Sequence, residues 1–129
     1  MQITTSLPTT TLNGEETIVK TFQGTLQTLG GLTLLTYEDP ELGLTRLFYT
    51  EDRLRLVRKG RFSTQMVFLP HGVTHSDYHT PNGTFDLEVH TALLRCTTTP
   101  DGGQFAVHYN LFLSGEEVAK NKLTIDYQS

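Results

Sequence analysis

The sequence has a single cysteine, Cys96, so no disulfide can form within the chain. It also lacks long hydrophobic runs: its longest apolar stretches span only a few residues and are too short to cross a bilayer. The first five residues, Met1–Thr5, lack the basic start and apolar core of a signal peptide. These absences argue against a secreted disulfide-rich protein and against a membrane protein. We therefore expect a cytoplasmic protein with no membrane partner.

Charge is also sparse. Charged residues make up 19% of the 129 residues and hydrophobic residues 36%, a balance that excludes a disordered chain and fits one domain over residues 1–129. The formal net charge of −4 argues against nucleic-acid binding by the chain as a whole. Six of the ten Lys and Arg residues nevertheless lie between positions 46 and 61.

The apolar residues follow the period of a strand rather than that of a helix. Phe85, Leu87 and Val89, for example, alternate with Asp86 and Glu88. Threonine is abundant, as is typical of strands, and turn residues recur at short intervals. Together these patterns predict strands at 2–11, 17–29, 32–38, 44–50, 53–59, 63–69, 74–79, 84–98, 103–113 and 117–127.

The short connections predict antiparallel neighbours in sequence order. Eight to ten such strands in an open sheet would leave two exposed edges, and closing the sheet removes them. The sequence therefore predicts an all-β, up-and-down meander barrel, with a two-sheet sandwich as the alternative. The long strands 84–98 and 103–113 are candidates for bending between two walls, and Gly24 is a candidate corner or bulge.

Short motifs that match a known family occur in order along nearly the whole chain. They are Tyr37 with Glu38, Arg58 with Gly60, Met66, Phe68, the run Tyr78-His79-Thr80-Pro81-Asn82-Gly83, Phe85, Leu87, Val89, Thr91, Tyr109 and Leu111. In order and spacing they resemble the YwiB-like family, small bacterial proteins of uncharacterised function. The resemblance implies a calycin-like (lipocalin-like) barrel and no particular activity. The chain has no Trp, so the Gly-x-Trp motif of lipocalins proper is missing, which weakens any analogy to secreted lipid transport.

Metal and nucleophile chemistry has little support. His71, His75 and His79 are spaced by four, but on a strand each step spans about 13 Å, whereas zinc needs nitrogens about 2 Å away. Only a tight turn at Pro70–Gly72 would bring two of them together, so we expect surface or hairpin histidines and no metal. We expect no cofactor either. Cys96 is either a small buried hydrophobe or, if Arg95 met it, an activated thiol; we expect the former.

The basic cluster divides by strand parity. Arg53, Arg55, Lys59 and Arg61 share one face, and Leu54, Leu56 and Arg58 share the other. If the leucines face the core, the first set forms an outer stripe. We interpret that stripe as solvated surface or, alternatively, as a site for an anionic partner such as RNA or a phosphorylated ligand.

Arg58 would then point into the barrel, where a guanidinium needs acceptors. Its partner is either a carboxylate of the protein, with Glu38 as the candidate, or the carboxylate or phosphate of a ligand; a bulge near Gly60 would instead turn it outward. Tyr37 and Tyr109 could offer hydroxyls to such a ligand, and Phe68 could line its pocket.

The leading hypothesis is therefore a non-enzymatic barrel that binds a small amphipathic or anionic molecule through Arg58, Glu38, Tyr37, Tyr109 and Phe68. The alternative is a structural or interaction module that binds RNA or an acidic protein through the outer stripe. An enzyme has the least support, because no acid–base or nucleophile set emerges. A barrel without free edges needs no partner copy, so the sequence favours a monomer over a homodimer.

Overall fold

The computed structural model describes residues 1–129, and every regular element in it is a β-strand. The strands are β1 (Gln2–Thr11), β2 (Gly14–Leu29), β3 (Leu32–Asp39), β4 (Gly43–Thr50), β5 (Arg53–Lys59), β6 (Ser63–Phe68), β7 (Val73–Thr80), β8 (Gly83–Thr99), β9 (Gly102–Leu113) and β10 (Glu116–Gln128). No helix is present that is long and apolar enough to span a membrane.

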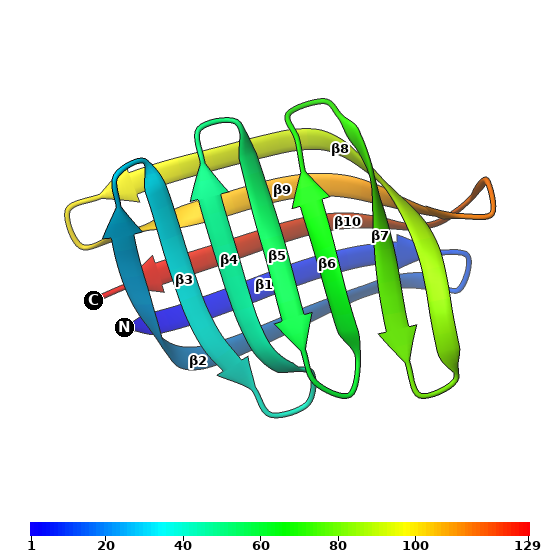
Figure 1. Cartoon of the computed structure of the whole chain (residues 1–129), viewed down its shortest axis with the longest axis horizontal. Coiled ribbons are helices and arrows are strands. Elements are labelled where there is room, and N and C mark those ends of the chain that lie inside the picture. Colours follow the sequence, from blue (N-terminus) through cyan, green and yellow to red (C-terminus); the bar gives the residue numbers. More distant parts are fainter.

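These ten strands form one closed barrel in which each strand pairs antiparallel with its neighbours in sequence, and β1 pairs with β10 (Figure 1). The predicted all-β meander barrel is thus confirmed. Nine of the ten predicted strands begin within one residue of the observed start. The exception is β2, predicted from residue 17 but beginning at Gly14, because Thr10 pairs with Glu15 and Thr9 with Glu16 in a hairpin that leaves both carboxylates exposed.

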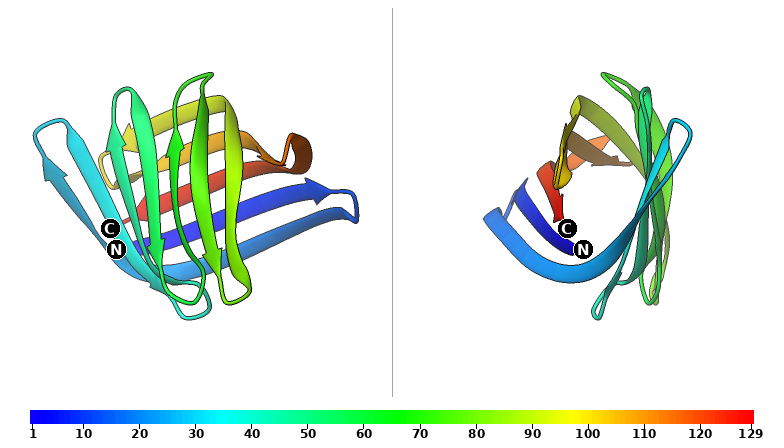
Figure 2. Two further views of the ribbon diagram at one scale, coloured as in Figure 1. Left: turned by 45° about the vertical axis from the view of Figure 1, so that its right-hand side comes forward. Right: turned by 90° about the vertical axis from the view of Figure 1, so that its left-hand side faces the viewer.

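The barrel is flattened into two walls whose strands cross at a steep angle (Figures 1 and 2). One wall contains β3 to β7, and the other contains β9, β10 and β1. Two long strands pass from wall to wall. As predicted, β8 bends; β9 stays in one wall, and the second strand that bends is β2.

Each bend has a local cause. In β8 the register with β9 shifts between Thr91 and Leu93, so that Ala92 is an extra residue that kinks the strand. In β2, pairing with β1 ends at Gln23 and pairing with β3 begins at Gly24. A Cβ at Gly24 would overlap the carbonyl oxygen of Thr36, so this corner requires glycine, as the sequence suggested.

The core fills the space between the walls. Its fully buried side chains come from both walls. They include Phe68, Phe105, Ile3, Leu35, Leu47, Leu54, Ile125, Val89 and Val107. The core gives way to the polar residues Lys20, Asp39, Arg58 and Thr64 where the candidate site lies.

The Gly24 corner gives a first prediction. We expect Gly24→Ala to lower the free energy of unfolding by about 2–3 kcal/mol, because backbone and core atoms must move to admit the methyl group. Gly31→Ala is the matched control: nothing lies within 4 Å of the position, and we expect its unfolding free energy to stay within about 0.5 kcal/mol of wild type. Urea unfolding followed by circular dichroism measures both. Equal stability of the two variants would contradict this account of the corner.

Candidate functional site

A cavity of about 150 Å³ opens into one end of the barrel, between the inner faces of the two walls. Ten of its fifteen lining residues are hydrophobic, so it resembles a small-molecule pocket with a few polar groups. Two larger depressions, of about 370 Å³ and 610 Å³, have linings dominated by polar residues, and the first shares Arg58 and Thr64 with the inner cavity. The inner cavity therefore has the better chemistry for a partly apolar ligand despite its smaller size.

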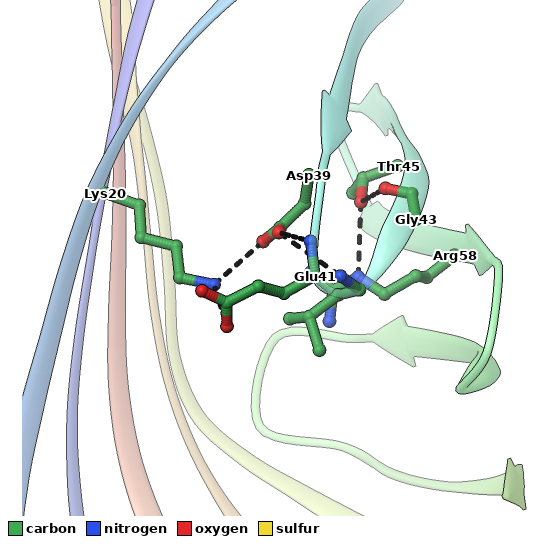
Figure 3. Close-up of polar contacts among 7 residues, drawn as sticks. Lys20, Asp39, Glu41, Gly43, Thr45 and Arg58 are labelled. Carbon is green, nitrogen blue, oxygen red and sulfur yellow. Dashed lines mark hydrogen bonds and ion pairs between the residues drawn. The ribbon is translucent and has the colours of Figure 1, made fainter.

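Arg58 lines this cavity. It follows Leu54 and Leu56 on the inner face of β5, and the pairing of β5 with β4 and β6 continues without a bulge up to Arg58. The side chain is half-buried, and its Nε donates a hydrogen bond of 3.2 Å to Oγ1 of the fully buried Thr45 (Figure 3). The parity of the strand thus places this guanidinium inside, as predicted.

Glu38, the predicted partner of Arg58, does not lie in the site. Leu35, Tyr37 and Asp39 form the inner face of β3, so Glu38, one residue out of phase, points outward and is exposed. The prediction was wrong by one position, and the carboxylate inside the barrel is that of Asp39, which is 4% exposed.

Asp39 is fully engaged with other groups (Figure 3). Its Oδ2 lies 3.1 Å from Nζ of Lys20, which reaches across from β2, and its Oδ1 accepts the N–H of Glu41 at 2.8 Å and that of Leu42 at 3.2 Å. Burial alone would raise the pKa of Asp39, but the two backbone donors and the Lys20 ammonium outweigh it and lower that pKa. Burial likewise opposes the charge on Lys20, but Asp39 and Glu41 raise its pKa. Asp39 and Lys20 neutralise each other.

Arg58 has no such partner. No carboxylate lies within 4.0 Å of its guanidinium, whereas Lys20 pairs with Asp39 and Glu41, and Arg53 pairs with Asp52. The cavity therefore carries one uncompensated positive charge, held in place by Thr45. Leaving it there is costly in a half-buried position unless water or a ligand supplies acceptors.

Two phenols surround this charge. Burial raises the pKa of Tyr37, and Arg58 opposes the rise. Burial raises the pKa of Tyr109 to about 12, again opposed by Arg58. Both hydroxyls are therefore protonated near neutral pH and can act as hydrogen-bond donors to an acceptor bound at Arg58.

An aromatic ring packs against each phenol. Phe22 stacks on Tyr37 and Phe68 packs against Tyr109, each with a centroid separation of 4.7 Å. Phe68 faces the interior but lies behind Tyr109, outside the cavity lining, so it supports the site rather than lining it.

The predicted outer stripe is on the outer surface. Arg53, Arg55, Lys59 and Arg61 are exposed or half-exposed there. Arg55 lies 4.4 Å above the ring of Phe48, and Arg61 lies 5.8 Å from the ring of Phe62. Arg53 is 3.5 Å from Asp52, whereas the other three have no carboxylate partner. The stripe is a cationic surface with an arginine stacked on an aromatic ring.

The histidines and Cys96 do not line the inner cavity, although His75 and His79 line the depression of about 370 Å³ that Arg58 also borders. His71, His75 and His79 are exposed, and no group of three His, Cys, Asp or Glu side chains is arranged to hold a metal ion. Cys96 is half-buried against the core, and burial raises the pKa of its thiol, while Arg95 points to the opposite face. The arrangement does not activate the thiol as a nucleophile.

Sequence reasoning missed Lys20, Asp39 and Thr45. The alternation Leu35, Tyr37, Asp39 was a signal that could have identified Asp39. Lys20 had no such signal, because it meets Asp39 only once the barrel closes.

The wall beside the cavity has an unusual seam. β6 and β7 share only two backbone register pairs, both at the start of β6. Beyond them, Ser76 Oγ donates to the carbonyl oxygen of Gln65 at 2.6 Å, and the Thr74 hydroxyl donates to the carbonyl oxygen of Val67. Side-chain hydroxyls thus replace part of the backbone ladder along this seam.

Comparison with known proteins gives a family and a fold. Residues 2–125 match the family described as "Domain of unknown function (DUF1934)". The crystal structure of the YwiB protein from Bacillus subtilis superposes with a TM-score of 0.87, over 99% of this chain and 89% of that chain, at 18% sequence identity. No curated protein shows significant sequence similarity to the chain.

The Asp39 network gives a second prediction. We expect Asp39→Asn to lower the free energy of unfolding at neutral pH by about 2 kcal/mol, because Lys20 loses its partner. Since folding lowers the pKa of Asp39, its contribution is fully present above the ordinary value of 3.8 and is lost as the pH falls through the folded-state pKa. The gap between wild type and variant should therefore close in acid.

Urea unfolding between about pH 7 and pH 2 measures this gap. Asp101→Asn, at an exposed turn, is the control and should track wild type throughout. A gap that stayed constant with pH would mean that the Asp39 carboxylate is not the group that stabilises this end of the barrel.

Proposed function

The chain belongs to the DUF1934 family of YwiB-like proteins, whose description assigns no function. From the site itself we propose that the protein is not an enzyme and that it binds a small anionic, amphipathic molecule inside the barrel. The observation that carries the proposal is Arg58, a guanidinium without a carboxylate partner that faces a mostly apolar cavity.

A ligand carboxylate or phosphate supplies what Arg58 lacks. Nε is occupied by Thr45, and the terminal nitrogens present the planar fork that binds such groups with two parallel hydrogen bonds. The hydroxyls of Tyr37 and Tyr109 lie near enough for the Arg58 charge to act on their pKa values, and they can donate to the same anion.

The apolar side of the cavity determines the size and polarity of the ligand beyond its anionic group. Leu56, Met66 and Leu123 line it, and Ile18, 44% exposed, lines it from the projecting β1–β2 hairpin. At about 150 Å³ the cavity is smaller than the roughly 300–1,000 Å³ of a pocket for a drug-sized molecule. It suits an anionic head with a short apolar segment, and a longer tail would leave along Ile18.

The titratable groups suit binding better than proton transfer. Asp39 and Lys20 hold each other in their charged forms, and Tyr109, with a pKa of about 12, keeps its proton near neutral pH. We also propose that the barrel resembles the calycin barrels both in shape and in holding a ligand inside. The single free thiol of Cys96 favours a cytoplasmic location.

The third prediction tests the role of Arg58. Native mass spectrometry of the purified protein, compared with the denatured sample, reports any molecule that copurifies, and calorimetric titration with linear monocarboxylates from butanoate to dodecanoate measures affinity. We expect carboxylate binding that weakens about 10- to 100-fold in Arg58→Gln, because a charge-assisted bidentate contact is lost.

Two controls separate the anchor from general damage. Arg95→Gln, on the outer face of β8, should bind carboxylates like wild type. Dodecanol, which has no charge, should bind wild type and Arg58→Gln equally. The absence of carboxylate binding in wild type, or equal loss of acid and alcohol binding in Arg58→Gln, would refute the proposal.

The outer stripe supports a second candidate, the binding of RNA or an acidic protein. Its supporting observation is that Arg55, Lys59 and Arg61 lack carboxylate partners while Arg55 stacks on Phe48, an arrangement open to an anionic group.

A fourth prediction follows for this candidate. If the stripe binds single-stranded RNA, affinity must fall steeply with added salt and must drop in Arg55→Ala with Lys59→Ala, but not in Arg58→Gln. Fluorescence anisotropy with a labelled oligonucleotide at two salt concentrations measures this. Binding that ignores salt, or no binding at low salt, would remove the candidate.

A further inference from the structure

The barrel is closed, but one of its strands keeps a free edge. β2 pairs with β1 from Gly14 to Gln23, whereas its pairing with β3 begins only at Gly24. Residues 14–23 therefore have a hydrogen-bonded neighbour on one side only. In Figure 1 this half of β2 lies at the border of the rear wall, with β1 on one side and no strand of that wall on the other.

The backbone groups that face the open side follow from the register. Gly24 N–H donates to the carbonyl oxygen of Met1 at 3.0 Å, and the β1–β2 pairing continues in step from there. Because backbone groups alternate in direction along an antiparallel strand, even-numbered residues of β2 bond to β1 and odd-numbered residues face outward. The outward N–H and C=O groups belong to Glu15, Thr17, Val19 and Thr21.

The side chains along this edge favour strand pairing. Ile18 is 44% exposed and Val19 is 62% exposed, and both are β-branched, as are Thr17 and Thr21. An edge with unpaired backbone groups and exposed apolar side chains is a template for a further strand unless charges of one sign or a proline block it. Here no proline interrupts residues 14–23, and the charges are of both signs.

We propose that this edge pairs with the same edge of a second copy of the chain, antiparallel, about a two-fold axis through Ile18. In that register Thr17 of each copy faces Val19 of the other, so outward backbone groups meet outward backbone groups. Ile18 faces Ile18 of the second copy, and Glu16 of each copy faces Lys20 of the other.

Side-chain matching selects this register over its neighbours. A shift of one residue places outward backbone groups opposite groups already bonded to β1, so no ladder forms. A shift of two places the Glu16 carboxylate opposite Ile18 or Phe22, whereas in this register the two exposed Ile18 side chains cover each other. Lys20 keeps its ion pairs with Asp39 and Glu41 in all of these registers. The apolar Ile18–Ile18 contact therefore forms in this register and not in the adjacent ones.

The proposed dimer interface lies next to the cavity. The argument for the interface uses only the open edge of β2 and does not depend on the proposed ligand. Ile18 and Lys20 line the cavity from the inner face of β2, and the second copy meets the open edge of this same segment. The interface thus runs beside the cavity mouth. The expectation of a monomer rested on a barrel without free edges, and residues 14–23 of β2 are such an edge.

Sedimentation velocity over a concentration series tests the proposal. We expect a dimer of the 14.5 kDa chain in wild type. Val19→Pro deletes an N–H on the open side and leaves the bonds to β1 in place, so the dimer dissociation constant should rise about 100-fold, as two symmetry-related hydrogen bonds are lost. Val19→Thr, which keeps the N–H and the β-branched shape, should remain dimeric.

A charge-swap experiment covers the case in which the proline variant fails to fold. Ile18→Lys and Ile18→Glu should each be monomeric alone, because two like charges then meet on the axis. Mixed in equal amounts they should form a heterodimer in which the lysine of one copy faces the glutamate of the other, and that recovery shows that both variants fold. A wild type that stays monomeric at the highest concentration reached, or a dimer unaffected by Val19→Pro and by both charge changes, would overturn the proposal.

Discussion

A closed sheet needs strands that can leave one wall and enter the other, and the rest of the molecule depends on the two places where this happens. At Gly24 the absence of a side chain lets β2 pass beneath the backbone of β3, and at Ala92 an extra residue kinks β8. Without these corners the walls would be two separate sheets with open edges. With them, the walls cross and enclose a core that is packed in the middle and hollow at one end.

That geometry explains why charge gathers where it does. Where the walls diverge, core side chains no longer meet across the gap, and water or polar groups must fill the space. Lys20 and Asp39 fill part of it as a mutually neutral pair, which also ties the free half of β2 to the turn after β3. Arg58 occupies the remainder with its charge uncompensated. A barrel end that needed only stability would not keep an unpaired guanidinium there, since an apolar side chain of similar size costs less to bury.

Strand patterning predicted most of the fold and part of the site. The period of two along residues 53–59 placed Arg58 inside and the stripe outside, because side-chain direction on a strand depends only on parity. The same rule, applied to residues 35–39, would have selected Asp39 instead of Glu38. Parity does not show which side chains meet across the barrel, so the pairing of Lys20 with Asp39 could not be predicted. It also could not reveal that residues 14–23 of β2 have no partner in β3, because the length of a strand does not determine which residues pair with each neighbour.

The seam between β6 and β7 has a consequence for how the barrel moves. A ladder of backbone hydrogen bonds opens cooperatively, whereas a hydroxyl that bridges to a carbonyl can rotate away singly, and only two backbone register pairs hold these strands. We therefore expect the free energy of local opening to be lowest between β6 and β7, so that the barrel opens there before it opens elsewhere. We expect the amide hydrogens that face this seam to exchange with solvent deuterium before those between β9 and β10, which pair along their whole length. Since Arg58 and Thr64 line both the inner cavity and the depression outside the seam, opening the seam would connect the two spaces.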